Sequence, residues 1–359
     1  MNKQLLGIYR DARRAGRHAE DRHHRPMSTI ANIAAALLLA ACSGGGSAPP
    51  APTVPPAPSA SAPAPSSLGD FPDPFVLADG GQYYAYATNG QGKNVQLLRS
   101  PDLRTWTAQP DVMPVLASWV RPANSMVWAP EVIKIGEKYV LYYTARDRGL
   151  DRQCVGAAVA SAPGGPYRDT SAGPLVCQVA EGGTIDAAPL ASGGKLYLYF
   201  KSDGNCCRLQ THLYAQELRA DGLALLGSPR ILLSNERGWE GGVVEAPTMV
   251  ERDGRFYLFY SANDYAGAAY AVGYASCAGP LGPCTPAPEN PILKSRAGVP
   301  RLTGPGHQAI FEAGGKSYIA YHAWEELAGG ARGDRRFMYL DELAWVEGKP
   351  VVRTTSMLP

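Results

Sequence analysis

The sequence predicts an all-β fold, a five-bladed β-propeller, from two features that repeat along the chain. The first is a short run of apolar and aromatic residues bounded by turn residues, typical of a buried strand. Five such runs occur, at 83–87, 139–143, 196–200, 256–260 and 317–321. They recur at roughly sixty-residue intervals, and a fixed period of strand-rich units is typical of propeller blades.

The second feature is a short proline-containing motif that precedes each run. The five motifs are Phe71-Pro72-Asp73-Pro74, Trp128-Ala129-Pro130, Asp186-Ala187-Ala188-Pro189, Glu245-Ala246-Pro247 and Gly304-Pro305-Gly306-His307. The chain also contains 40 Gly and 31 Pro, as expected for many short strands joined by turns. Five motifs before five strands support five blades.

Length and charge limit the classes of function. The 359 residues carry a formal net charge of only +2, and 45% are hydrophobic. Such a balance suits a globular domain with a full core and gives no indication of nucleic-acid binding. We expect a monomer.

The N-terminal region predicts export. Residues 1–42 combine a polar, Arg- and His-rich extension with an apolar run from Ala34 to Ala41, which is too short to span a membrane. Leu39-Ala40-Ala41-Cys42 resembles the bacterial lipobox, so we expect a lipoprotein signal with Cys42 as the lipidated residue. An ordinary signal peptide for secretion is the alternative, and either Met1 or Met27 can be the start. The lipid would be the protein's only membrane attachment, in the cell envelope at the outer membrane.

Two further boundaries follow from composition. Residues 43–67 are almost entirely Gly, Ser, Ala and Pro, a composition that cannot bury apolar surface and predicts an extended linker. The folded domain is expected to span residues 68–359.

Six cysteines follow the linker, and an even number in an exported chain predicts disulfides. Cys277 and Cys284 flank a turn-rich loop, and Cys154 and Cys177 lie on strands expected to be successive, which leaves the adjacent residues 206 and 207. Sequence leaves the pairing open among fifteen possibilities. Zinc binding is the alternative, although no CxxC spacing supports it.

Three acidic residues stand at the starts of three units. Asp73, Asp186 and Glu245 each precede the apolar run of their unit, and we interpret their positions as equivalent. Equivalent positions of propeller blades surround the central axis, so the three carboxylates should converge. Mutual repulsion and burial should then keep at least one protonated near neutral pH. A charged carboxylate beside a protonated carboxylic acid provides the chemistry of glycoside hydrolysis.

The five motifs in this order resemble those of glycoside hydrolase family 43, in particular its arabinanase-like branch. The resemblance covers residues 68–355 and includes the closing segment around Arg336 and Trp345. It implies a five-bladed propeller and an inverting glycosidase that hydrolyses arabinan, arabinoxylan or xylo-oligosaccharides, plant-type pentose polymers.

The resemblance also implies roles for individual residues. Asp73 matches the general base and Glu245 the general acid, which apolar surroundings and Asp186, the modulator of its pKa, should keep protonated. His307 matches a histidine near the channel that in many members accompanies a calcium ion or an ordered water. No cofactor is expected for the chemistry. The base and the acid should stand about 6.5–9.5 Å apart.

Two further residues are candidates for substrate binding. Trp128 is expected to form a wall of the sugar site, and Arg336, in preference to Arg335, is expected to reach the site from the last unit.

The expected activity is hydrolysis of arabinan or arabino-oligosaccharides. A β-xylosidase or an exo-α-L-arabinofuranosidase is the first alternative, and a carbohydrate-binding propeller without catalysis is the second, because fold does not fix function. The presence of all three carboxylates favours an enzyme.

Overall fold

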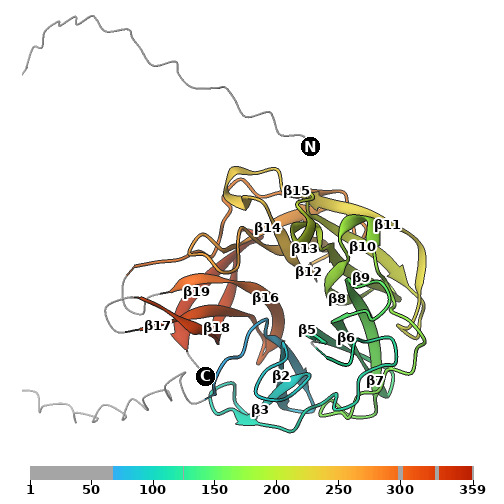
Figure 1. The fold of residues 1–359 in the computed structure, drawn as a ribbon. Helices are drawn as coiled ribbons and strands as arrows, with labels where there is room; N and C mark the ends of the chain where they lie inside the picture. Colours follow the sequence, from blue (N-terminus) through green and yellow to red (C-terminus); the bar gives the residue numbers. More distant parts are fainter. Residues whose placement is uncertain (1–67, 124, 298–301, 328–330, 358–359) are drawn as a thin grey trace, which may run out of the picture. The chain divides into compact units, whose positions relative to one another are not determined.

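Five antiparallel sheets make up the protein and confirm the predicted five-bladed β-propeller. The computed structural model describes residues 68–123, 125–297, 302–327 and 331–357. Figure 1 shows the sheets following one another around a centre in chain order, with β5, β8, β12 and β16 innermost. The predicted lipoprotein signal, Cys42 and the 43–67 linker lie outside the described residues.

Each blade pairs its strands in the order of the sequence. Blade 1 contains β1 (Phe75–Asp79), β2 (Gln82–Ala87), β3 (Gln96–Ser100) and β4 (Thr107–Ala108). Blade 2 contains β5 (Trp128–Ile135), β6 (Lys138–Arg146) and β7 (Gln153–Ala160). Blade 3 contains β8 (Thr184–Ser192), β9 (Lys195–Ser202), β10 (His212–Leu218) and β11 (Leu225–Ser234). Blade 4 contains β12 (Val244–Arg252), β13 (Arg255–Ala262), β14 (Ala271–Cys277) and β15 (Cys284–Pro286). Blade 5 contains β16 (Thr303–Ala313), β17 (Lys316–Glu326), β18 (Arg332–Val346) and β19 (Lys349–Met357). Three 3-10 turns, η2 (Val179–Glu181), η3 (Gly204–Cys207) and η4 (Gly238–Glu240), complete the regular structure of the described ranges.

The five predicted apolar runs form the second strand of each blade, and their tyrosines join neighbouring blades. Four of these tyrosines donate a hydrogen bond to a backbone oxygen in an outer loop of the next blade, because a buried phenol needs a partner. The pairs are Tyr86 with Pro163 (2.6 Å), Tyr142 with Gly222 (2.7 Å), Tyr199 with Pro280 (2.9 Å) and Tyr257 with Gly348 (2.8 Å). The tyrosine-rich runs therefore fill the core and also fix the blades against one another.

The residues just before β1 close the ring. The N–H of Phe71 donates to the carbonyl of Arg336 at 2.8 Å, and the N–H of Arg336 donates to Asp70 Oδ1 at 2.6 Å. The ring of Phe71 is buried in the core that blades 1 and 5 share. This closure brings Arg336 close to the motif that contains Asp73.

Three disulfides account for all six cysteines of the described residues. They join Cys154 to Cys177, Cys206 to Cys207 and Cys277 to Cys284. These are the pairs suggested by the order of the predicted strands and turns, and they leave none of the six as a free thiolate for zinc.

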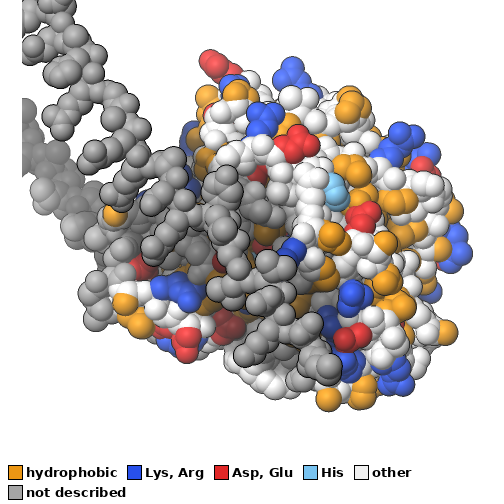
Figure 2. All heavy atoms as spheres, turned by 45° about the horizontal axis from the view of Figure 1, so that its top comes forward, with side chains coloured by type: hydrophobic (Ala, Val, Ile, Leu, Met, Phe, Trp, Pro, Cys, Tyr) orange, Lys and Arg blue, Asp and Glu red, His pale blue; other side chains and the backbone are white. Residues whose placement is uncertain are grey.

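The surface carries both signs of charge. Figure 2 shows Lys and Arg side chains interspersed with Asp and Glu side chains over the visible part of one face. Among the described residues, no helix is long and apolar enough to cross a bilayer.

Candidate active site

The chain has the same irregularity in every blade, within the first strand of blades 2 to 5 and just before β1 in blade 1. There, one non-glycine residue adopts the left-handed conformation, which costs about 1–3 kcal/mol and persists only where surrounding contacts hold it. The five residues are Asp73 (φ 56°), Ala129 (44°), Asp186 (57°), Ala246 (50°) and His307 (51°). In blades 2 to 5 the strand pairing also shifts register at this point.

Hydrogen bonds between blades hold these interruptions. In four cases the backbone N–H of the left-handed residue donates to a side chain on the second strand, or its end, in the preceding blade. The pairs are Ala129 with Thr88 Oγ1 (2.9 Å), Asp186 with Thr144 Oγ1 (3.3 Å), His307 with Ser261 Oγ (2.8 Å) and Asp73 with His322 Nδ1 (3.1 Å). Blade 3 has Lys201 at this position, which cannot accept, and the N–H of Ala246 donates instead to Asp186 Oδ2 at 3.0 Å.

The pairing corrects one part of the sequence interpretation. Asp73, Asp186 and His307 are equivalent, but Glu245 lies one residue before the left-handed Ala246. Its equivalent in blade 2 is Trp128, since Glu245 pairs with Ser261 as Trp128 pairs with Thr144. The expectation that all three carboxylates are equivalent is therefore wrong for Glu245. The spacing to proline gave no indication of this shift of one residue.

The three carboxylates nevertheless converge on one cavity of about 320 Å³. Every site residue predicted from the sequence lines it. The lining residues are Asp73, Thr88, Trp128, Ile185, Asp186, Lys201, Asp203, Asn205, Cys206, Glu245, Tyr265, His307 and Arg336.

Asp73 is surrounded by donors. Arg336 Nη1 lies 3.3 Å from Asp73 Oδ1, His307 Nδ1 lies 3.4 Å from the same oxygen, and Thr88 Oγ1 donates to Oδ2. Burial alone would raise the pKa of Asp73, but the charges of Arg336 and then His307 outweigh it and hold that pKa well below its usual value. Asp73 is therefore a carboxylate at neutral pH.

Glu245 has a different pair of partners. Lys201 Nζ lies 3.0 Å from Oε2, and the hydroxyl of Tyr270 donates to Oε1 at 2.6 Å. The Lys201 side chain is fully buried, and its ammonium also donates to Asn205 Oδ1 at 2.7 Å. Tyr270 reaches Glu245 because residue 306 is glycine: a Cβ there would lie 2.0 Å from the tyrosine ring.

The charge state of Glu245 differs from the sequence expectation. Burial raises the pKa of Glu245, but Lys201 and the Tyr270 hydroxyl lower it further than burial raises it, so its pKa lies below the usual value. The pKa of its neighbour Asp186 is raised, chiefly by burial and also by the charge of Glu245. In this arrangement Asp186 holds a proton more readily than Glu245 does. The expectation of a protonated Glu245 was wrong because the sequence does not show that Lys201 lies against it.

A fourth carboxylate, Asp203, lies at the end of β9 and was not predicted. Its burial, together with the charges of Asp186 and Glu245, raises its pKa to about 6. Asp203, Lys201 and Asn205 all belong to the segment that ends β9 and enters η3. Their clustering just after the Leu196–Phe200 run was a signal in the sequence.

The calcium ion or ordered water expected near His307 stays a prediction. Calcium prefers six to eight oxygen ligands, whereas the His307 ring stacks on His322 and its Nδ1 lies 3.4 Å from Asp73 Oδ1, an oxygen already paired with Arg336. Within the described residues there is no group of three or more His, Cys, Asp or Glu side chains suited to a metal.

The two predicted substrate contacts also reach the cavity. Trp128 begins β5 and is partly buried in the wall. Arg336 faces the site and also lies over the ring of Tyr265, 5.2 Å from its centre, whereas Arg335 pairs with Glu325.

The chain is similar to known proteins in sequence and in fold. The sequence model of Glycosyl hydrolases family 43 matches residues 63–350. A β-D-galactofuranosidase of Aspergillus niger is 29% identical over 71% of this chain and 74% of its own, and an extracellular endo-α-(1→5)-L-arabinanase of Bacillus subtilis is 24% identical over 77% and 86%.

Solved structures agree. A thermostable family-43 glycoside hydrolase superposes with a TM-score of 0.73 at 28% identity, covering 82% of this chain and 96% of its own. An endo-1,4-β-xylanase of Bacteroides thetaiotaomicron superposes with a TM-score of 0.70 at 28% identity, covering 81% and 97%. The family match extends from the segment before Asp73 to the start of β19, and thus includes strands of all five blades and every residue that lines the cavity. The chain therefore belongs to glycosyl hydrolase family 43 and is a glycosidase.

Proposed function

We propose that the protein hydrolyses α-L-arabinofuranosyl linkages in arabinan and arabino-oligosaccharides by an inverting acid/base mechanism. The observation that carries the proposal is that Asp73 and Glu245 line one cavity with separate sets of partners, Arg336 for one and Lys201 for the other.

The names of the relatives support a furanosyl substrate. The A. niger relative is a galactofuranosidase, the B. subtilis relative an arabinanase, and a third, from Streptomyces chartreusis and 28% identical over 69% of this chain, an exo-α-(1→5)-L-arabinofuranosidase. Galactofuranose and arabinofuranose share the five-membered ring that such a site would bind.

Asp73 suits the general base in this scheme. Its low pKa keeps it ionised, and its carboxylate would accept a proton from a water that attacks the anomeric carbon. Arg336 and Thr88 would fix its orientation, a condition for efficient proton transfer. Trp128 would pack against the apolar face of the sugar.

Glu245 suits the general acid, and Lys201 sets its strength. An acid whose pKa is lowered transfers its proton more readily but is protonated in a smaller fraction of molecules at neutral pH. Asp186, whose pKa is raised, would hold a proton beside Glu245. The scheme uses carboxylates alone and requires no cofactor.

A second candidate is action on xylan or xylosides, either as a β-xylosidase or, like the Bacteroides neighbour, as a xylanase. An exo-acting α-L-arabinofuranosidase is a third reading. A propeller that binds sugar without cleaving it is the non-catalytic alternative.

Hydrolysis of linear arabinan, debranched arabinan, xylan and the nitrophenyl α-L-arabinofuranoside and β-D-xyloside tests these readings, with Glu245→Ala in parallel. Release of arabino-oligosaccharides that is lost in the variant supports the proposal. Turnover of a nitrophenyl pentoside alone indicates an exo-acting enzyme, and turnover of xylan indicates a xylanase. Sugar binding without turnover, unaffected by Glu245→Ala, overturns the catalytic proposal.

We also propose that the enzyme is exported and attached through Cys42. Three disulfides and relatives named as extracellular support export. Metabolic labelling with palmitate should mark the intact chain and not the Cys42→Ala variant.

A further inference from the structure

We propose that the disulfide between the adjacent residues Cys206 and Cys207 forms the wall of a sugar subsite on the leaving-group side of the cavity. The inference rests on the proposed glycoside cleavage between Asp73 and Glu245. In this proposal, the disulfide contacts the sugar that leaves when the glycosidic bond is cleaved.

The first observation is the position of the pair. Cys206 and Cys207 end η3, and both are exposed. Cys206 nevertheless lines the same cavity as Asp73 and Glu245, with Asn205 and Asp203 beside it. Of the three disulfides, only the one between Cys206 and Cys207 has a cysteine, Cys206, in the lining of that cavity.

The second observation places the pair on the side of the acid. Lys201 donates to Asn205 Oδ1 at 2.7 Å and to Glu245 Oε2 at 3.0 Å, so a hydrogen-bonded path joins η3 directly to Glu245. Asp73 is held from blade 5, by Arg336. In an inverting reaction the acid protonates the leaving oxygen while the base acts from the opposite face. A surface tied to Glu245 therefore faces the leaving sugar.

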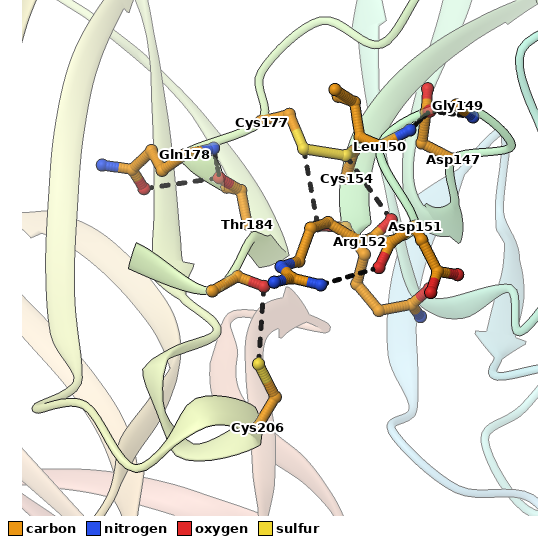
Figure 3. Close-up of a disulfide and its surroundings, with 12 residues drawn as sticks. Asp147, Gly149, Leu150, Asp151, Arg152, Cys154, Cys177, Gln178, Thr184 and Cys206 are labelled. Carbon is orange, nitrogen blue, oxygen red and sulfur yellow. Dashed lines mark hydrogen bonds between the residues drawn. A yellow bond between two sulfur atoms is a disulfide. The ribbon is translucent and has the colours of Figure 1, made fainter. Parts of the chain in front are cut away.

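The third observation is that the disulfide is supported from behind. Cys206 Sγ lies 3.5 Å from the carbonyl oxygen of Gly182, and Figure 3 shows Cys206 directed toward the segment that leads from Cys177 to Thr184. At Gly182 a Cβ would lie 2.5 Å from the Asp203 carbonyl oxygen and 3.0 Å from Cys206 Sγ. Glycine at 182 therefore lets this segment pack directly against the Cys206–Cys207 disulfide. The segment is itself anchored to β7 by the disulfide between Cys177 and Cys154.

The chemistry of the pair suits a sugar. Two adjacent disulfide sulfurs offer a polarizable apolar surface without a hydrogen-bond donor, which can pack against the C–H face of a sugar ring by dispersion. Asn205 and Asp203 lie next to it and can bind hydroxyl groups, the combination of apolar wall and few polar groups found in ligand sites.

The test compares Cys206→Ala/Cys207→Ala with the matched control Cys277→Ala/Cys284→Ala, which removes a disulfide on the outer strands of blade 4. For each protein the KM for arabinotriose and xylotriose is measured, together with the inhibition constants of L-arabinose and D-xylose. The comparison uses the trisaccharide that the wild type cleaves and the monosaccharide of the same sugar. We expect the Cys206/Cys207 variant to raise KM for the trisaccharide about tenfold and to change inhibition by the monosaccharide less than twofold. The control should change neither.

A second measurement uses the wild-type protein and does not depend on a variant folding. Limited reduction followed by alkylation and mass spectrometry measures the rate at which each disulfide opens. Saturating trisaccharide should slow modification of Cys206 and Cys207, whereas the monosaccharide should not, and Cys277 and Cys284 should react equally in all cases.

Two results would overturn the inference. One is an unchanged trisaccharide KM with no protection of Cys206 and Cys207 in a wild type that cleaves the substrate. The other is a Cys206/Cys207 variant that weakens binding of the trisaccharide and of the monosaccharide by the same factor. A wild type that cleaves neither trisaccharide would instead contradict the proposed function, and the inference would fail with it.

Discussion

The ammonium of Lys201 lies 3.0 Å from Oε2 of Glu245, and the lysine side chain is fully buried. Burying a charged lysine costs free energy unless an opposite charge pairs with it, so this contact stabilises the charged forms of both Lys201 and Glu245. It also determines how Glu245 can act, because the cation lowers the pKa of the group proposed to donate the proton.

Removing the cation should move the pH dependence of catalysis. The general acid must be protonated, so kcat/KM falls as pH rises through its apparent pKa. In Lys201→Met, burial of Glu245 is no longer opposed by Lys201, the pKa of Glu245 rises, and the falling limb of kcat/KM should shift to higher pH. The control Lys195→Met removes an exposed lysine of the same strand, paired with Glu217, and should leave the limb in place. An unmoved limb in Lys201→Met would contradict the assignment of Glu245 as the acid.

Replacing the proposed base should abolish turnover in a way that an added anion repairs. Asp73→Asn should lower kcat by about 10²–10⁴-fold, the usual contribution of a general base. Azide needs no deprotonation and should restore activity by forming a glycosyl azide. The control Asp79→Asn, in the same blade and paired with Lys134, should retain wild-type kcat. Failure of azide to rescue a folded Asp73→Asn protein would count against the base role.

The buried His322 should make stability depend on pH. Burial, the largest effect, lowers its pKa from 6.5 to about 4 in the folded protein. The unfolded chain therefore takes up the proton first as pH falls, and the stability present above pH 6.5 is lost progressively toward pH 4. The loss amounts to roughly 3 kcal/mol, from the difference in pKa. Denaturant titrations at several pH values should show this slope.

His322→Thr gives the matched comparison. Threonine accepts the N–H at the equivalent position of blades 1 and 2, and it does not titrate in this range. The variant should therefore flatten the dependence between pH 6.5 and 4. A variant with the same slope as the wild type would assign the effect to other groups.

The hydrogen bonds between blades should contribute to stability individually. Thr144→Val keeps the shape of the side chain but removes the acceptor for the N–H of Asp186, and an unsatisfied buried donor costs about 1–3 kcal/mol. Thr107→Val, at an exposed position of β4, is the control and should change the unfolding free energy by less than about 0.5 kcal/mol. Equal unfolding free energies for the two variants would show that the Thr144 bond is not stabilising.

The sequence was sufficient for the features that repeat. The five apolar runs became β2, β6, β9, β13 and β17, and cysteine positions relative to these strands suggested the disulfide partners. The strands and the cysteine positions both follow from short, repeated sequence patterns, which the periodicity of the sequence reveals. Trp128 and Arg336 were predicted correctly to line the cavity because the sequence shows their positions within the repeated units.

The charge partners were not readable because they come from different blades. Glu245 in blade 4 meets Lys201 from blade 3, and Asp73 in blade 1 meets Arg336 from blade 5. Lys201 occupies the position at which blades 1, 2, 4 and 5 have Thr88, Thr144, Ser261 and His322, side chains that can accept a hydrogen bond. Only alignment of the strand pairings shows this exception, and the same alignment shows that Glu245 lies one residue before the position equivalent to Asp73 and Asp186.

The stereochemistry of the product tests the central claim most directly. Proton NMR during the first minutes of arabinobiose or arabinotriose hydrolysis resolves the anomer released before mutarotation. An inverting reaction between Asp73 and Glu245 predicts that the β-anomer appears first and the α-anomer later. Initial release of the α-anomer would mean retention and would contradict the proposed roles of these two carboxylates.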